Sequence, residues 1–526
     1  MILIYLIIIL FVGGLLAWLA NHFNEMASRL ISVTAILVNL ILILFIWIKN
    51  YSDISLGSEV WLYQYQQPWI ERFGINWHFA LDGLSLLLLT LTFFLGLLSV
   101  LASWSQIKEK VGFFHFNLLW ILAGITGVFL AMDLFLFYFF WEIMLIPMYF
   151  IIGIWGHEKR IYASFKFFIF TQASGLLMFL AILGLYFFHG AQTGKYTFEY
   201  EMLLGTTLPE FWSYILMGGF LIAFLVKLPA VPFHNWLPDA HTEAPTAGSV
   251  ILAGLLLKTG AYGLLRFVIP LFPEAVVGFA PYGMFLGVLS ILYGAKLAFA
   301  QTDMKRLVAY SSVSHMGFVL LGVFALNELA YQGVVVQLLA HGISTGALFI
   351  LVGGIHERLH TRNIEDFGGI WNIVPKMGAM ALLFAMASLG LPGLGNFIAE
   401  FFILAGSFQA SAVLTIFATL GLVAATLYSL RMFQKVFQGK QPSSISMKDL
   451  NLREMGMMLL MAVAIIWIGL YPKNIIETAS VPLKKILEHP NIERQAEQLG
   501  VLNKNLPDDC SQVAVIDRTS KLKEND

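Results

Sequence analysis

Charge is scarce in this sequence. Only 12% of its 526 residues are Asp, Glu, Lys or Arg, whereas 59% are hydrophobic. A soluble domain carries roughly twice that charged fraction, so the composition excludes a soluble enzyme. The formal net charge of −1 says nothing about partners, because the charges are sorted into loops. The sequence has no basic stripe that would suggest nucleic acid as a partner.

Cysteine is almost absent. Cys510 is the single one, which excludes a disulfide within the chain and a cysteine-ligated iron–sulfur cluster of its own. The GxGxxG and P-loop motifs that hold nucleotides are missing, as are HExxH and Cys/His clusters that hold metals. We therefore expect no NAD, flavin, ATP or metal site in this chain, so its energy must come from an ion gradient or from partner subunits.

Apolar runs are abundant and recur from end to end. Each has about 20 residues, the length that crosses a bilayer as a helix. They predict an all-α polytopic membrane protein with about fourteen transmembrane helices. The predicted spans are 2–20, 28–48, 79–103, 114–132, 134–155, 165–189, 213–231, 246–268, 278–300, 305–325, 329–355, 376–408, 410–436 and 454–472.

Basic residues alternate between the predicted loops. One set of loops holds nearly all of them. The other set holds few, namely Lys49, Arg72 and Lys195, with Arg266 at a helix end. Because basic loops stay in the cytoplasm, this asymmetry places both termini on the periplasmic side. The first run has no basic residue before it, so we interpret it as a retained helix and not a signal peptide. Residues 473–526 are predicted to form a polar periplasmic tail with room for one amphipathic helix near 480–498. The basic set comprises Arg29, Lys108, Lys110, Lys159, Arg160, Lys305, Arg306, Arg358, Arg362, Lys376, Lys435, Lys440, Lys448 and Arg453.

Two charged residues of opposite sign lie inside predicted spans. Lys227 precedes Pro229 and Pro232, and Glu142 follows a mostly aromatic stretch. An ionisable residue at membrane depth is a functional hypothesis by default, and Lys227 is the obvious cationic partner for Glu142. The alternative is a static salt bridge between two helices, which would contribute little to stability.

Four further residues extend this set. Lys258 lies in mid-span with no carboxylate near it in sequence, and we take it as the best single proton-holding candidate. His315 and His341 lie on consecutive spans and suit a proton relay, although a structural hydrogen-bonding role is the alternative. Glu400 follows a helix break at 390–395. Other polar residues near span ends are predicted to orient, cap or give access to the spans, namely Asp82, Asp133, Asp239, His241, Lys296, Asp303, Lys305 and Arg306.

These residues lie in segments that resemble a known family. WEIMLIPM at 141–148, KLPAVPFHNWLPDAHTEAPT at 227–246 and QTDMKRLVAYSSVSHMG at 301–317 are similar to the antiporter-like subunits of respiratory complex I, the proton-pumping NADH:quinone oxidoreductase. The resemblance covers nearly the whole chain. Glu400, where sister subunits usually carry lysine, points to the subunit M branch, which is chain 4 in mitochondria.

The resemblance implies an organisation for the chain. Helices 1–3 would occupy 1–113, two inverted five-helix repeats would occupy 114–268 and 278–436, and a loop with the last helix would occupy 437–472. Discontinuous helices in corresponding places of two repeats are typical of ion paths.

The resemblance also implies roles and partners. Glu142 and Lys227 would be the coupling pair, Lys258 the central proton carrier, His315 and His341 the bridge, and Glu400 the residue towards the periplasmic exit. FMN, Fe–S clusters and quinone would belong to partner subunits. The expected partners are antiporter-like neighbours on both sides, with lipids, in a bacterial inner membrane.

Three other functions are compatible with parts of the sequence. A subunit of a multisubunit Na+/H+ antiporter shares several of the motifs. The membrane arm of a hydrogenase-linked or photosynthetic complex would differ in the electron donor. A structural scaffold is a third possibility, but several mid-span charges argue against it, because charges at membrane depth are costly.

Overall fold

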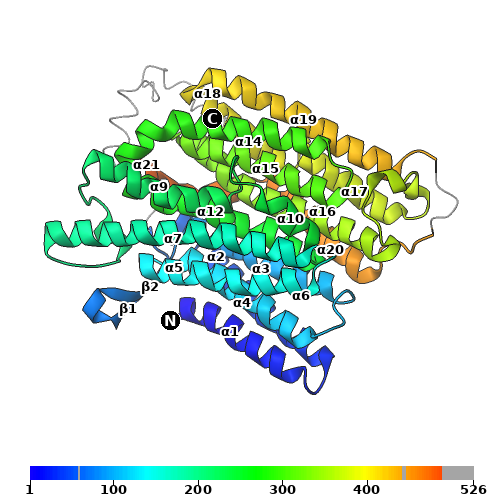
Figure 1. Ribbon diagram of the computed structural model, residues 1–526, viewed down its shortest axis with the longest axis horizontal. Helices are drawn as coiled ribbons and strands as arrows, with labels where there is room; N and C mark the ends of the chain where they lie inside the picture. Colours follow the sequence, from blue (N-terminus) through cyan, green and yellow to red (C-terminus); the bar gives the residue numbers. More distant parts are fainter. Residues whose placement is uncertain (57–59, 441–445, 489–526) are drawn as a thin grey trace, which may run out of the picture.

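A computed structural model of the chain describes residues 1–56, 60–440 and 446–488. Its helices run side by side in one bundle, with α1 at one edge and α19 at the other (Figure 1). In the described part, 13 helices are long and apolar enough to cross a membrane. The broken pair α17 and α18 covers the one predicted span that is not among these 13, which agrees with the predicted all-α fold. The long helices are α1 (Ile2–Ala20), α2 (Glu25–Leu56), α3 (Gly83–Ser103), α4 (Val111–Leu130), α7 (Arg160–Thr193), α9 (Glu210–Lys227), α14 (Pro273–Phe299), α15 (Met304–Phe324), α16 (Glu328–Leu359), α19 (Ala412–Phe437) and α20 (Leu452–Leu470).

The remaining spans are interrupted helices. The first is α5 (Leu134–Ile143) with α6 (Leu145–Trp155). The second comprises α11 (Thr246–Ile251), the π-helical segment η2 (Leu252–Leu256), α12 (Leu257–Gly263), the π-helical segment η3 (Leu264–Val268) and α13 (Ile269–Leu271). The third is α17 (Pro375–Ser388) with α18 (Gly395–Ala410). Each interruption places backbone carbonyls outside the regular helical ladder, which is tolerated at membrane depth only inside protein or a watery cavity.

Burial separates central from peripheral helices. The most apolar stretches of 246–271 and of α16 are wholly buried, whereas a third of the corresponding stretch of α19 is buried. Helices that are apolar all round belong in the core or against lipid. The ion-path candidates Lys258 and His341 therefore lie on the two central helices.

Glycine permits the break between α17 and α18. Gly390 and Gly393 have φ values of 80° and 94°, a left-handed region that is costly for other residues. Pro392 between them has no N–H to donate. The predicted interruption at 390–395 is thus present, and it ends α17 at Ser388 and starts α18 at Gly395.

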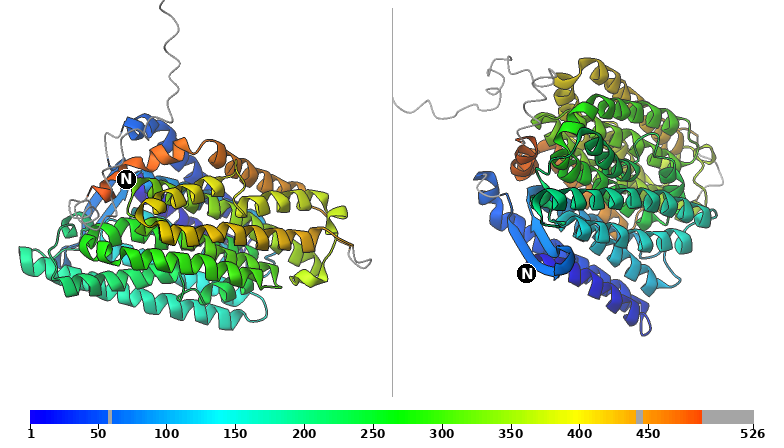
Figure 2. Two further views of the ribbon diagram at one scale, coloured as in Figure 1. Left: turned by 90° about the horizontal axis from the view of Figure 1, so that it is seen from above. Right: turned by 60° about the vertical axis from the view of Figure 1, so that its left-hand side comes forward.

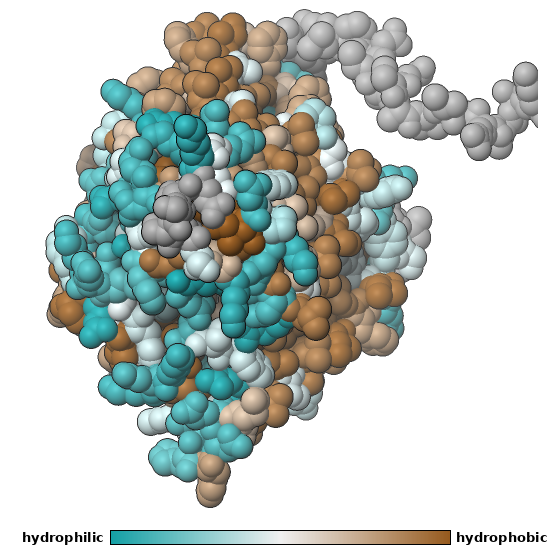
Figure 3. Space-filling view, turned by 90° about the vertical axis from the view of Figure 1, so that its right-hand side faces the viewer, coloured by the Kyte–Doolittle hydropathy of each residue, from teal (hydrophilic) through white to brown (hydrophobic). Residues whose placement is uncertain are grey.

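One end of the bundle is strongly polar. It is the end where α6 and α16 finish and α17 begins, and hydrophilic side chains cover it while brown apolar flanks surround it (Figure 3). Loops of the predicted basic set meet here: Arg29 donates to Ile107 O at 3.1 Å and Arg453 to Ser105 Oγ at 3.0 Å. The predicted basic loops therefore gather on one face of the bundle.

A hairpin and an amphipathic helix occupy the opposite end. Strands β1 (Tyr63–Ile70) and β2 (Ile75–Leu81) pair antiparallel beside the N-terminus (Figure 2), a feature that the sequence analysis did not predict. The short helix α8 (Tyr200–Leu203) lies in the loop that follows α7, and α10 (Trp236–Glu243) lies between α9 and α11. Short 3₁₀ turns are η1 (Glu71–Phe73), η4 (Ile364–Asp366) and η5 (Ile370–Asn372).

Helix α21 (Lys473–Leu487) begins earlier than the amphipathic helix expected near 480–498. It packs closely on α3, because a Cβ atom on Gly83 would lie 1.6 Å from Thr478 O. The first part of the predicted tail therefore belongs to the folded body, and 489–526 lie outside the described residues.

Candidate functional site

Lys258 and His341 form the centre of a buried polar row. Lys258 Nζ donates to Ala253 O at 2.6 Å and lies 2.7 Å from His341 Nδ1. Lys258 is 1% exposed and His341 is 0% exposed. The predicted candidates on α12 and α16 are thus in direct contact.

The π-helical segment η2 explains how Lys258 is held. Its wider turn changes the regular i→i−4 bonding, and Ala253 within it accepts from the ammonium group five residues later. Segments of this kind occur often at functional sites. A second one, η3, follows α12, so Lys258 lies on a short α-helical stretch between two wide turns.

The row continues from His341 to Glu400. The rings of His341 and His315 have their centroids 5.6 Å apart. His315 Nδ1 lies 2.8 Å from Glu400 Oε1, and both side chains are buried. Gln337 Nε2 also donates to Glu400 Oε1, at 3.1 Å. Four of the six predicted residues are therefore brought together in one row.

Residues on both sides of the break between α17 and α18 contact the ring nitrogens of His315. Ser388, the last residue of α17, lies 3.2 Å from His315 Nε2, and Tyr428 Oη on α19 lies 3.3 Å from the same atom. Glu400 lies on α18, just after the break. Among Lys258, His341, His315 and Glu400, two buried side-chain atoms have no hydrogen-bond partner in the described residues, His341 Nε2 and Glu400 Oε2. A proton can therefore leave from His341 Nε2, and a proton can be bound at Glu400 Oε2, without breaking a hydrogen bond.

Lys227 lies apart from this row. It ends α9, is 1% exposed, and its Nζ has no hydrogen-bond partner in the described part of the chain. Aromatic rings face it instead: Nζ is 5.0 Å from the centroid of Trp141 and 5.8 Å from that of Phe167. Ring faces attract a cation but do not accept its proton.

Glu142 does not form the expected ion pair with Lys227. Glu142 is only half-buried, and its Oε1 has no hydrogen-bond partner among described residues. It lies against Gly175 of α7, where an added Cβ atom would lie 2.7 Å from Oε1. Glu142 Oε1 and Lys227 Nζ thus make no direct hydrogen bond among the described residues, and the role of the pair stays a prediction. The physical reason is that Trp141, next to Glu142 in α5, turns its ring towards Lys227.

A second buried pair was missed by the sequence analysis. Arg266 Nη2 forms a salt bridge with Asp82 Oδ2, and the two side chains are 4% and 0% exposed. Arg266 Nε also donates to Tyr262 Oη at 3.3 Å. Lys258, Tyr262 and Arg266 follow each other at four-residue spacing on one helix. That spacing was the available signal, but the partner lies 184 residues away in sequence.

The other polar residues mostly act as caps or pairs, as expected. Asp82, Asp133 and Asp303 accept backbone N–H groups at the start of α3, α5 and α15. Asp239 pairs with Lys166 at 2.6 Å and with Arg306 at 3.3 Å.

Two of the residues near span ends are fully buried. Lys305 was predicted as an orienting charge or cap, but it is 1% exposed and donates to Ala244 O at 2.6 Å. It is buried because α15 packs along α10. His241 is 0% exposed, stacks on Phe349 at 4.8 Å, and both its ring nitrogens lack a partner in the described residues.

No group of three His, Cys, Asp or Glu residues able to hold a metal occurs in residues 1–56, 60–440 and 446–488. The chemistry open to the row is proton transfer between lysine, histidine and carboxylate.

Comparisons with known proteins bear on this arrangement. The model of the family described as NADH:quinone oxidoreductase/Mrp antiporter, TM, matches residues 131–427. The chain is 53% identical to NADH-quinone oxidoreductase subunit M of Pseudomonas aeruginosa over 494 residues, covering 92% of this chain and 97% of the relative. Subunit M of Escherichia coli K12 is 52% identical over 489 residues, covering 91% and 96%.

Two solved structures are also similar. A chain of respiratory complex I from Thermus thermophilus matches with a TM-score of 0.83 and 33% identity, covering 92% of this chain and 99% of that one. A chain of the Mrp complex from Dietzia matches with a TM-score of 0.81 at 19% identity, covering 95% and 99%. The second likeness concerns the fold alone.

Proposed function

Because this chain belongs to the NADH:quinone oxidoreductase/Mrp antiporter family, we propose that it is the antiporter-like subunit M of a proton-translocating NADH:quinone oxidoreductase. The observation that carries the proposal is the buried row Lys258, His341, His315 and Glu400. Proton translocation needs groups that bind and release protons, such as lysine, histidine and carboxylate, arranged one after another in space along a membrane-buried path.

The row supports a stepwise transfer. Lys258 gives a proton to His341 Nδ1, which it faces at 2.7 Å. His341 releases a proton from its partner-free Nε2 towards His315. His315 passes it to Glu400 at 2.8 Å, and the free Glu400 Oε2 delivers it to the periplasmic side. Histidine suits the middle of such a row because its two nitrogens can receive and release protons separately.

Glu142 and Lys227 supply the coupling. With no salt bridge between them at rest, a change in their separation alters the charge felt by Lys227. At ~4 Å and an effective dielectric of ~20 the Coulomb energy is ~4 kcal/mol. That energy corresponds to about a thousandfold change in the proton-binding equilibrium of Lys227. Motion of α5 or α7 is thereby converted into proton loading of Lys227 and then of Lys258.

Two of the breaks between helices fit inverted repeats at 114–268 and 278–436. One lies between the end of α9 at Lys227 and the start of α10 at Trp236, and the other lies between α17 and α18, before Glu400. Each repeat would therefore provide half of the path.

The source of energy lies outside this chain. Electron transfer from NADH to quinone, with FMN and Fe–S clusters, belongs to partner subunits. Antiporter-like neighbours lie on both sides, in contact with the exposed apolar faces of α7 and α19, in a bacterial inner membrane with both termini in the periplasm. The exposed residues on these faces include Ile161, Phe165, Ile169, Leu180, Ile416, Phe417, Leu420 and Val423.

Gentle purification through a C-terminal tag tests this assignment. Co-purification of Fe–S and flavin subunits with NADH:quinone activity is the expected result. Recovery of small hydrophobic subunits without any redox protein would instead assign the chain to a Na+/H+ antiporter, whose fold it shares.

A further inference from the structure

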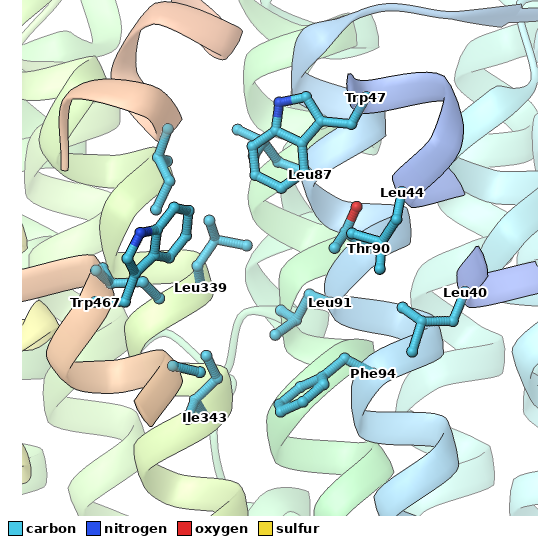
Figure 4. Close-up of a pocket in the computed structure, with 13 residues that line it drawn as sticks. Leu40, Leu44, Trp47, Leu87, Thr90, Leu91, Phe94, Leu339, Ile343 and Trp467 are labelled. Carbon is cyan, nitrogen blue, oxygen red and sulfur yellow. The ribbon is translucent and has the colours of Figure 1, made fainter. Parts of the chain in front are cut away.

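An apolar groove opens beside α16, the helix that carries His341. It lies between α2 and α3 on one side and α16, α20 and α21 on the other (Figure 4). Its volume is about 390 Å³. Trp47 and Trp467 lie near one end and Phe94 near the other, with Leu91, Leu339 and Ile343 along the walls.

The groove offers almost no polar contact to an occupant. The hydroxyl group of Thr90 already donates to Leu86 O at 2.8 Å, and Trp47 Nε1 donates to Thr478 Oγ1 at 3.0 Å. Water would find too few partners there. An extended peptide would leave its N–H and C=O groups unpaired, and a helix about 10 Å wide displaces more than this volume. The occupant must be a slender hydrocarbon.

Exposed apolar side chains flank the groove. Phe45 on α2 is 58% exposed and Val463 on α20 is 66% exposed, on the outer side of the same helices. Trp47, Tyr51, Trp467 and Tyr471 gather at the end near α21, and such aromatic residues are enriched where membranes meet water. The groove therefore runs from a headgroup region into the hydrocarbon. From Leu87 to Phe94 of α3 it extends about 10 Å at 1.5 Å per residue.

We infer that this groove binds one acyl chain of a phospholipid from the leaflet on the α21 side. This inference rests on the placement of the chain in a membrane and not on the proton-translocating function. Leu91, which lines the groove, also packs closely on α16, because a Cβ atom added to Gly342 would lie 3.0 Å from Leu91 Cδ2. Gly342 follows His341, so the bound chain supports the wall behind the polar row.

Photo-crosslinking tests the inference on the intact complex. The complex is reconstituted into phosphatidylethanolamine/phosphatidylglycerol vesicles with a trace of phosphatidylethanolamine that carries a diazirine in one acyl chain. After irradiation, labelled peptides are mapped by mass spectrometry. Labelling is expected at 87–94 and 339–343. Ala464→Trp, which fills the groove, should lower it about tenfold, the effect of two methylenes losing their burial.

Val463→Trp is the matched control, because Val463 is the neighbouring residue on the outward face of α20. It should leave the labelling of 87–94 and 339–343 unchanged. If Ala464→Trp prevents assembly, Thr90→Phe fills the same groove from α3. Labelling that is no stronger in the groove than at Phe45 on the outer side of α2, or that neither filling variant lowers, would overturn the inference.

Discussion

Lys258 Nζ and His341 Nδ1 lie 2.7 Å apart, and both side chains are buried. An ammonium group only donates, so His341 Nδ1 must be unprotonated while Lys258 is charged. Neutral His341 then carries its proton on Nε2, the atom without a partner among described residues. The contact thus holds one proton on Lys258 Nζ, shared in a hydrogen bond with His341 Nδ1, and leaves the proton on Nε2 available for transfer to His315.

Replacement of Lys258 should uncouple pumping from electron transfer. Lys258→Ala removes the donor at the head of the row, and we expect proton translocation to fall at least about tenfold, since a positioned proton donor contributes 10²-fold or more. Assembly should be kept, because a buried charge that is costly to hold has been removed.

Proton uptake into inside-out membrane vesicles, driven by NADH and measured with a pH-sensitive dye, checks this result. Lys296→Ala is the control, because Lys296 is exposed near the end of α14. Normal pumping by an assembled Lys258→Ala complex would contradict the proposed row.

A methyl group on Gly175 should disturb the coupling residue without touching the row. In Gly175→Ala the new Cβ atom would lie 2.7 Å from Glu142 Oε1, so the carboxylate must move. We expect fewer protons per NADH oxidised, with the subunit still assembled, because alanine favours helix over glycine by about 1 kcal/mol.

Gly218→Ala is the matched control for this substitution. Gly218 also lies in a membrane helix, and nothing lies within 4 Å of its added Cβ atom. The proton-to-NADH ratio should match the parent in this variant. Equal ratios in both variants would show that the position of Glu142 does not matter for coupling.

Hydropathy predicted much of this architecture, and local sequence predicted the break before Glu400. The limits of α1 agree with its predicted span, and Gly390, Pro392 and Gly393 interrupt the helix as their backbone preferences require. The pattern of apolar residues indicates how long each helix is and whether it is buried, but it does not indicate which helix faces pack against each other. For that reason the Lys258–His341 contact was not predicted.

Other features have no local signal in the sequence. Four of the five residues in the π-helical turn at 252–256 are Leu or Ala, which favour a regular α-helix. Glu142 and Lys227 have the charges of a pair, yet the orientation of Trp141 leaves Lys227 facing a ring. The pairing of Asp82 with Arg266 joins residues 184 positions apart. Tertiary packing decides each of these cases.

Breaking the Asp82–Arg266 pair should destabilise the subunit. Arg266→Met leaves the buried carboxylate of Asp82 without its cation, and loss of one partner of a buried pair costs about 3–5 kcal/mol. The double variant Asp82→Asn/Arg266→Met removes both charges and should recover most of that loss. The stabilities of the variants are compared by heating the purified complex and measuring the temperature at which this chain is released.

Arg306→Met serves as the exposed counterpart. Arg306 pairs with Asp239 at 3.3 Å but its side chain is 40% exposed, so we expect a loss of at most about 1 kcal/mol. If Arg266→Met is no more harmful than Arg306→Met, the buried pair has no structural importance.

Asp133 should make the stability of this chain depend on pH. Its carboxyl group caps α5, accepting from Phe135 N at 2.9 Å and Leu136 N at 3.0 Å, and also from Asn76 N at 3.0 Å. Burial outweighs these donors and raises the pKa of Asp133 from its ordinary 3.8 to about 7. Between these two values the folded chain keeps a proton that the unfolded chain has lost. The free energy of unfolding therefore decreases as the pH rises through this window and levels off above it.

Asp133→Asn should abolish that dependence. The amide oxygen still accepts from the N–H groups of the first turn, as asparagine does at many helix starts, but the amide has no proton to lose. We expect the thermal midpoint of the parent, relative to the variant, to be highest near pH 4 and to fall towards pH 7, because only the parent pays for charging a buried carboxylate. Thermal midpoints of the parent and of Asp133→Asn, measured from pH 4 to pH 7, test this expectation. Curves that stay parallel would mean that Asp133 is ionised throughout, held by its three backbone donors.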